Sequence, residues 1–485
     1  MTRILRGSLA VLLLVGVAAL PAAAQVDTGS ADFSNYVAVG DSLTAAIVSG
    51  GWVGYNQANS FPALIHRQAT GTDDGFEQPT ISSPGIPAPL RVLSLSPVIL
   101  APASSSIGAP TNLMLPRPYN NLGIPGADVG DTVRTVTDGG GAHDLVLRGL
   151  GTALQQAVAS HPTFVTLWIG NNDALGAATS GLAIDGVTLT TLSSFEADYR
   201  TVAGALASTG AKMAIATVPP VTTLPFVNTV PRVVVNPATS QPVLGPTGAP
   251  IPLIGPDGPL AAGDHVLLTA TTYLAQGFGI PAALGGNGQP LPDTVVLNAA
   301  ETAKISDRVN GYNSIIRTVA GEVGAALIES GPLLQEFVSG GVDIGGITYT
   351  SSFLTGGLFS YDGVHPSPFG YAYIANEYIK AINETYDASI PEVDLYPFIF
   401  GEFSLAPAAV TVAEARSAQL SPDAVSNLHW LLTSPDASAV KEPPRGRGKG
   451  GRGQGADDPA TQDDEPSAID QPDPTPRGRG GRSDF

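Results

Sequence analysis

YVAVGDSLT, residues 36–44, joins an apolar run to a short polar turn near the start of the chain. The run at 36–39 has the composition of a buried strand, and it stops at Gly40. A serine that follows a strand of a parallel sheet lies at the carboxyl edge of that sheet, where open α/β folds bind ligands. If a helix begins there, its N-terminal amides favour negative charge on a reacting oxygen. Ser42 is therefore a candidate nucleophile, although Gly-Asp-Ser is also ordinary turn and cap chemistry.

Apolar runs of the same kind recur downstream and alternate with amphipathic stretches. The runs at 163–169 and 211–218 each end at a turn signal, a glycine in the first case and two prolines in the second. The stretches 196–208 and 304–323 carry apolar side chains at three- and four-residue spacing, which predicts amphipathic helices. Strands that alternate with helices indicate an α/β fold, in which helices cover both faces of a parallel sheet.

Two further blocks carry hydrogen-bond donors. NLGIPGAD, residues 121–128, contains Gly126, whose backbone N–H can approach a ligand closely because no side chain intervenes. A plain turn is the alternative. WIGNNDAL, residues 168–175, places Asn172 just past a buried strand, where its amide can donate to an oxyanion. Capping of the following helix is the alternative there, and it suits Asp173 better than Asn172.

YDGVHPSPFGYAYIANEYI, residues 361–379, places a histidine three residues after an aspartate, at the start of a further amphipathic stretch. The carboxylate of Asp362 can orient the ring of His365 and stabilise its charged form, as a general base facing a serine requires. A surface turn and a metal-chelating Asp-His pair are the alternatives. No third ligand is suggested nearby, so we expect no metal.

Together these four blocks resemble the SGNH, or GDSL-type, serine esterase and lipase family. The resemblance covers residues 36–379 and extends to IATVPP at 215–220 and VNGYNSII at 309–316. It implies a three-layer α/β/α flavodoxin-like fold with about five parallel strands. Many relatives have a glycine soon after the serine, where this chain has Ala45-Ala46, so the resemblance does not extend to the mouth of the site.

The resemblance also implies roles for five residues. Ser42 would be the nucleophile and would offer one oxyanion donor through its backbone N–H. Gly126 would supply a second N–H, and Asn172 a third donor through its side chain. His365 would take the serine proton and return it to the leaving alcohol, while Asp362 orients the imidazole. No cofactor is required.

The implied function is hydrolysis of carboxylic esters by a secreted enzyme, through an acyl-enzyme. The insertion phrases SLSPVIL and IPAALGG can line an acyl groove, although similar runs can also simply close a core. The first interpretation favours acyl lipids or other apolar small-molecule esters as substrates. The alternatives are a carbohydrate acetylesterase of the same fold and a surface binding module without catalysis. The resemblance makes Asp41 and Asp173 structural partners in the loops.

The two ends of the chain differ from its body. Residues 1–24 place two arginines before an apolar run and end in small residues, which is the layout of a cleaved signal peptide. The run is shorter than the roughly 20 apolar residues of a stable membrane span, so we expect export to the periplasm or the extracellular space. We expect the SGNH domain at 25–395, Pro- and Gly-rich insertions at about 78–118 and 226–292, a packing segment at 396–440, and a disordered Arg/Gly and acidic tail at 441–485.

Composition excludes several classes of protein. The chain has no cysteine, which excludes disulfides, thiolate metal sites and a cysteine nucleophile. Its formal charge of −19 repels phosphate backbones, so we expect no nucleic acid partner. Nothing in the sequence indicates an oligomeric state.

Overall fold

Five short strands form one parallel sheet in the order β13-β6-β5-β1-β4. A computed structural model describes residues 26–405 and 408–432, so the expected signal peptide and Arg/Gly tail lie outside the described residues. The order reverses between β1 and β5, and such a switch point opens a crevice at the carboxyl ends of the two strands. The strands are β1 (Tyr36–Gly40), β4 (Asn121–Gly123), β5 (Phe164–Trp168), β6 (Lys212–Ala216) and β13 (Ala326–Ile328).

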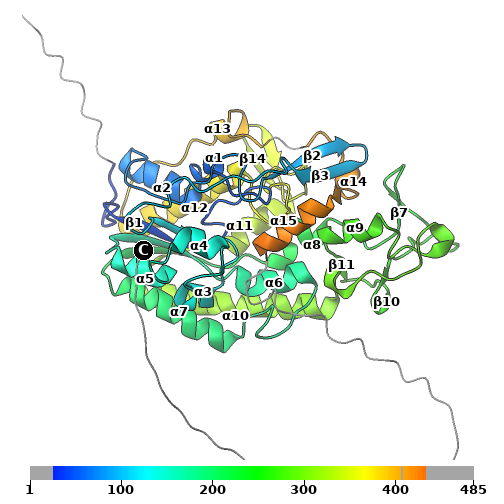
Figure 1. Cartoon of the computed structure of the whole chain (residues 1–485), viewed down its shortest axis with the longest axis horizontal. Coiled ribbons are helices and arrows are strands. Elements are labelled where there is room, and N and C mark those ends of the chain that lie inside the picture. Colours follow the sequence, from blue (N-terminus) through cyan, green and yellow to red (C-terminus); the bar gives the residue numbers. More distant parts are fainter. Residues whose placement is uncertain (1–25, 406–407, 433–485) are drawn as a thin grey trace, which may run out of the picture. The chain divides into compact units, whose positions relative to one another are not determined.

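Helices cover both faces of this sheet (Figure 1). On one face α3 (Val129–Arg134), α5 (Ala153–Ala159), α7 (Leu192–Ala207) and α10 (Ala299–Val323) pack together, and α2 (Phe61–Thr70) packs with α12 (Pro368–Tyr386) on the other. Every residue of β1 and β5 is buried, as expected for strands covered on both sides. The three-layer α/β/α fold predicted from the sequence is confirmed.

Two of the predicted helices begin earlier than their apolar pattern suggests, because polar residues cap them. The side chain of Thr191 accepts a hydrogen bond from the N–H of Ser194 at the start of α7. Asn298 and Glu301 form a reciprocal capping box at the start of α10. Each cap satisfies backbone donors that would otherwise have no partner in the first turn of the helix.

Both long insertions contain local structure of their own. The first holds the hairpin of β2 (Leu90–Leu95) and β3 (Val98–Pro102), and β16 (Gln419–Leu420) pairs in parallel with β3. In the second, which Figure 1 draws in green, β11 (His265–Val266) pairs with β12 (Val296–Leu297). Its other elements are β7 (Val235–Asn236), β8 (Gln241–Pro242), β9 (Ile254–Gly255), β10 (Gly258–Pro259) and α9 (Thr271–Leu274).

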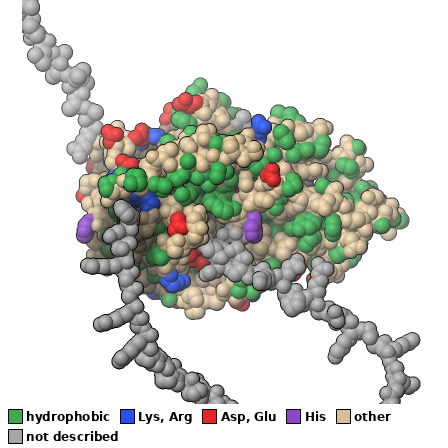
Figure 2. Space-filling view, in the orientation of Figure 1, with side chains coloured by type: hydrophobic (Ala, Val, Ile, Leu, Met, Phe, Trp, Pro, Cys, Tyr) green, Lys and Arg blue, Asp and Glu red, His purple; other side chains and the backbone are tan. Residues whose placement is uncertain are grey.

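The remaining elements are short and connect or cover the layers. They are α1 (Gly54–Gln57), α4 (Ala142–Leu147), α6 (Asn172–Ser180), α8 (Pro225–Asn228), α11 (Ser330–Ser339), α13 (Tyr396–Ile399), α14 (Val412–Ala415), α15 (Pro422–Leu432), β14 (Val342–Ile344) and β15 (Ile347–Tyr349), with 3-10 turns at Val221–Thr223, Leu268–Ala270, Ala282–Leu284 and Asp293–Val295. Charged side chains are scattered over the face shown in Figure 2, in keeping with a charged content of 13%. None of the described helices combines the length and the apolar character that crossing a membrane would require.

Candidate active site

The structure brings Ser42, His365 and Asp362 into one hydrogen-bonded series. Ser42 follows β1 by two residues, and His365 lies in the loop that leads into α12. The Nε2 atom of His365 is 2.9 Å from the Oγ of Ser42, although 323 positions separate the two residues in the chain. The Nδ1 atom of His365 is 2.9 Å from Oδ2 of Asp362. This is the geometry in which an imidazole can take the proton of a serine hydroxyl while a carboxylate holds the ring.

Asp362 is held as a carboxylate by its surroundings. Its Oδ1 accepts from the backbone N–H groups of Val364 and His365, both at 2.8 Å, and its Oδ2 also accepts from the N–H of Gly50. Burial raises the pKa of Asp362, but the interaction with His365 and the backbone hydrogen bonds from Val364 and His365 lower it by more. The pKa therefore lies below its usual range. An ionised carboxylate at Nδ1 favours the tautomer in which Nε2 is free to accept the serine proton.

Three N–H groups at the carboxyl ends of neighbouring strands have no partner in the described part of the chain. Neither the N–H of Ser42 nor that of Gly126 donates a hydrogen bond to any residue that the structure describes. Gly126 has a φ of +83°, in the left-handed region that glycine adopts without strain. Asn172 donates one amide N–H to the carbonyl of Ala127 at 2.8 Å, which leaves its second N–H for a ligand. These donors follow β1, β4 and β5, which are adjacent in the sheet.

Asp41 fixes the loop that carries Ser42. Its Oδ1 accepts from the N–H of Leu43 at 3.0 Å, and its Oδ2 accepts from the side-chain amide of Asn171 at 2.7 Å. Burial raises the pKa of Asp41 to about 6, although both hydrogen bonds lower it. Asp41 therefore joins the loop after β1 to the loop after β5.

Asp173 makes a similar connection on the other side of Asn172. Its Oδ2 accepts from the N–H of Val129 at 3.0 Å, so the start of α6 is tied to the chain just beyond Gly126. Burial and the neighbouring carboxylates raise its pKa well above the usual range. The alternative that Asp173 caps the helix is wrong, because Asp173 lies inside the first turn of α6 and Asn171 occupies the cap position.

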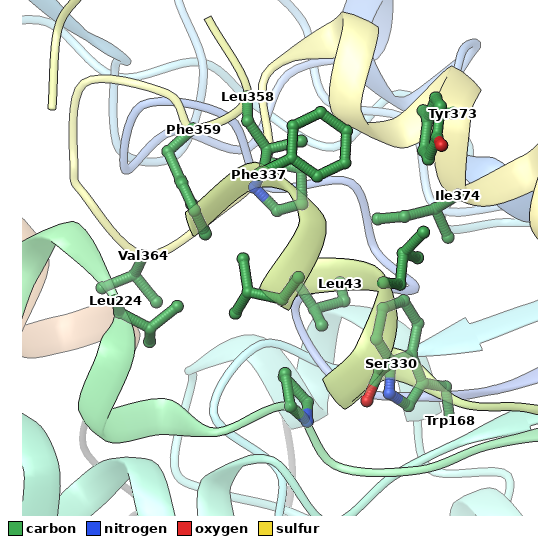
Figure 3. Close-up of a pocket in the computed structure, with 14 residues that line it drawn as sticks. Leu43, Trp168, Leu224, Ser330, Phe337, Leu358, Phe359, Val364, Tyr373 and Ile374 are labelled. Carbon is green, nitrogen blue, oxygen red and sulfur yellow. The ribbon is translucent and has the colours of Figure 1, made fainter. Parts of the chain in front are cut away.

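An apolar pocket, shown in Figure 3, is lined in part by the chain neighbours of Ser42 and His365. The cavity has a volume of about 80 Å³, and none of the described residues that line it is charged. Leu43 follows Ser42 directly, while Val364 precedes His365, so one end of the pocket lies beside the reacting groups. Phe337 of α11 and Tyr373 of α12 line it as well, with their rings edge to face at 5.2 Å.

The wall of this pocket comes from a different part of the chain than the insertions named from the sequence. We expected the insertions to line an acyl groove, but no residue of 78–118 or 226–292 lines the pocket. Instead α11 contributes Leu333, Leu334 and Phe337. The spacing of Leu333, Leu334 and Phe337 indicates an amphipathic helix, although none of the three marks chemistry. Among the described residues, no three His, Asp or Glu side chains are grouped so that they could hold a metal ion.

A parallel sheet whose carboxyl edge carries a serine hydrogen-bonded to a histidine, which is itself hydrogen-bonded to an aspartate, is the arrangement of a serine-dependent hydrolase. The chain belongs to the GDSL-like lipase/acylhydrolase family, whose model matches residues 36–378, and it is a carboxylic ester hydrolase. A search of curated proteins found no match.

The solved structures that are similar to this chain include two esterases. One is the lipase/acylhydrolase from Enterococcus faecalis, with 13% identity over 56% of this chain and 78% of that chain, and a TM-score of 0.26. The other is the acetyl xylan esterase AlAXEase, with 16% identity over 71% of this chain and 98% of that chain, and a TM-score of 0.29.

Proposed function

We propose that the protein is an exported serine esterase that acts on esters with apolar acyl groups, with Ser42 as its nucleophile. The observation that carries the proposal is the 2.9 Å contact between Ser42 Oγ and His365 Nε2, beside a pocket without charged lining. Export rests on the layout of residues 1–24 in the sequence.

The proposed reaction has two steps. Ser42 Oγ attacks the ester carbonyl carbon as its proton passes to Nε2 of His365, and the carbonyl oxygen takes up the negative charge. The N–H groups of Ser42, Gly126 and Asn172 are free to donate to that oxygen. When the intermediate collapses, His365 returns the proton to the leaving alcohol. Water then attacks the acyl-enzyme with the same histidine as base, which releases the acid and restores the serine.

The apolar pocket supports an apolar acyl group as the preferred substrate. Each methylene group that moves from water into such a pocket contributes about 0.8 kcal/mol, or roughly a fourfold gain in kcat/KM when the gain persists in the transition state. A charged acyl group would lose its hydration without finding a partner among the lining side chains.

The proposal is tested by assaying the wild-type protein beside Ser42→Ala on nitrophenyl esters from acetate to palmitate, together with an acetylated glycan. We expect kcat/KM to rise with acyl length until the pocket is full, and Ser42→Ala to lose the activity. A preference for the acetylated glycan, with no rise along the ester series, would favour the carbohydrate acetylesterase. Full activity of Ser42→Ala would refute the proposed mechanism.

The role of the pocket is tested by replacing one of its lining side chains with a smaller one. Phe337 is 2% exposed, and Phe337→Val should move the preferred acyl chain to longer esters while short esters are hydrolysed at similar rates. Phe400→Val is the matched control, because Phe400 is 52% exposed and does not line the pocket. An unchanged acyl-length profile in Phe337→Val would show that the acyl group binds elsewhere.

A further inference from the structure

A second cavity lies between three segments that are additions to the five-stranded sheet. It has a volume of about 340 Å³, and none of its described lining residues also lines the pocket beside Ser42. The second insertion contributes most of its wall, including Val234 and Leu253. Pro97, in the turn between β2 and β3, and Arg416, just after α14, complete it. In Figure 1 these three segments are found at β3, α9 and α14.

Hydrogen bonds tie the C-terminal part of this cavity to both insertions. Gln419 and Leu420 pair with Ile99 and Leu100 of β3, and the N–H of Leu420 donates to the hydroxyl of Thr271 at 3.2 Å. Residues 416–419 lie beyond the 36–378 range that the family model matches. The cavity therefore depends on a segment that the match to the family does not include.

The lining of the cavity combines an apolar floor with one positive charge. Val230, Val234 and Leu253 are buried at its floor, with exposed fractions of 8%, 5% and 2%. Among the described residues that line the cavity, Arg416 is the only charged one, and none is Asp or Glu. Its guanidinium makes no ion pair or side-chain hydrogen bond with the described part of the chain, although the sequence has 42 acidic residues against 23 basic ones.

This lining matches one chemical class of ligand. A guanidinium binds carboxylates through two parallel hydrogen bonds, while apolar walls bind a hydrocarbon chain. Neutral apolar ligands would leave the cation unused, and short anions would leave the apolar floor exposed to water. We propose that the cavity binds a medium-chain carboxylate, with its head group at Arg416 and its chain along Val230, Val234 and Leu253. This ligand class follows from the cavity alone and does not depend on the chemistry assigned to Ser42.

The test measures binding of decanoate by calorimetry after the pocket beside Ser42 has been filled. A p-nitrophenyl alkylphosphonate first blocks that pocket, and mass spectrometry of the product reports separately whether Ser42 reacted. If Ser42 does not react, the same titration uses unmodified protein and counts the sites. We expect one decanoate per chain on the blocked protein, with weaker binding of 1-decanol, which has the same chain without the charge.

Three variants decide whether the ligand occupies this cavity. Arg416→Gln should weaken decanoate binding roughly threefold to tenfold, because a charge-assisted hydrogen bond is lost at a solvent-exposed position. Ala275→Trp should abolish it, because Ala275 is an exposed lining residue where an indole would fill the entrance without disturbing the core. Arg232→Gln is the control, since Arg232 lies between two lining residues but does not itself line the cavity. Absence of binding to wild type, or affinity unchanged by either Arg416→Gln or Ala275→Trp, would overturn the proposal.

Discussion

Replacing Asp362 with asparagine tests how the carboxylate sets the state of the histidine. The two oxygens of Asp362 together face three backbone N–H groups and Nδ1 of His365. Asparagine keeps the shape of the side chain but has one acceptor oxygen and one NH₂ group. One of the two sites must therefore receive a donor in place of an acceptor.

The hydrogen bonds indicate which orientation the amide takes. With its oxygen at the Oδ1 position it keeps the bonds from Val364 and His365, and its NH₂ group opposes only the N–H of Gly50. The reverse orientation opposes two N–H groups, and each such conflict costs about 1–3 kcal/mol. The first orientation places the NH₂ group against Nδ1, so the imidazole proton moves to Nε2. A protonated Nε2 cannot accept the proton of Ser42.

The expected result for Asp362→Asn is a fall in kcat on the order of 10⁴, which corresponds to about 5 kcal/mol of lost transition-state stabilisation. The assay is ester hydrolysis under saturating substrate, with thermal unfolding to verify that the variant is folded. Asp198→Asn is the control, since that carboxylate pairs with Arg134 at the surface, away from the site. A folded Asp362→Asn enzyme within tenfold of wild type would refute the argument about the tautomer.

Three further predictions concern the loops around the serine. Asn172→Ala should lower kcat by about 10²–10³ with little change in KM, because its free N–H acts on the oxyanion; unchanged steady-state kinetics would remove it from the site. Ala46→Gly should change the free energy of unfolding by less than about 1 kcal/mol, because glycine relieves the strained φ of +60° and this gain offsets the lost methyl group and the more flexible unfolded chain. Ala45→Gly, measured by urea unfolding in the same way, should cost about 1–2 kcal/mol, and equal losses in the two variants would exclude strain at Ala46. Burial raises the pKa of Asp41 from 3.8 to about 6, so its contribution to stability is fully present below pH 4 and is lost as the pH rises through 6, by up to about 3 kcal/mol. Asp41→Asn should therefore flatten the pH dependence of the free energy of unfolding relative to wild type, and parallel curves for the two proteins would contradict the assignment.

The sequence predicted the parts of the fold that have long apolar patterns. β1, β5 and β6 each contain five residues and end at a turn signal, so their composition identifies them. β4 and β13 contain three residues each, which is too short for a periodic pattern to be recognised. They become strands because the neighbouring strands β1 and β6 supply their hydrogen-bond partners.

The candidate site likewise contains residues that local sequence predicts and residues that it does not. Ser42 and Asn172 follow recognisable strands, so their position at the carboxyl edge of the sheet could be inferred from local sequence. The 2.9 Å approach of His365 depends on contacts between distant segments, and here the resemblance to a family supplied what local patterns do not contain. The apolar pocket could not be predicted, because the α11 side chains that line it resemble any other core residues in the sequence.

The most direct test of the account is to identify the residue that reacts with an alkylphosphonate. The reagent forms a stable adduct only with a nucleophile that a neighbouring base activates, and mass spectrometry of peptides locates the adduct. We predict one adduct per chain at Ser42, formed in proportion to the loss of esterase activity and absent from His365→Ala. Inactivation by an adduct at any other residue, with Ser42 unmodified, would contradict the central claim.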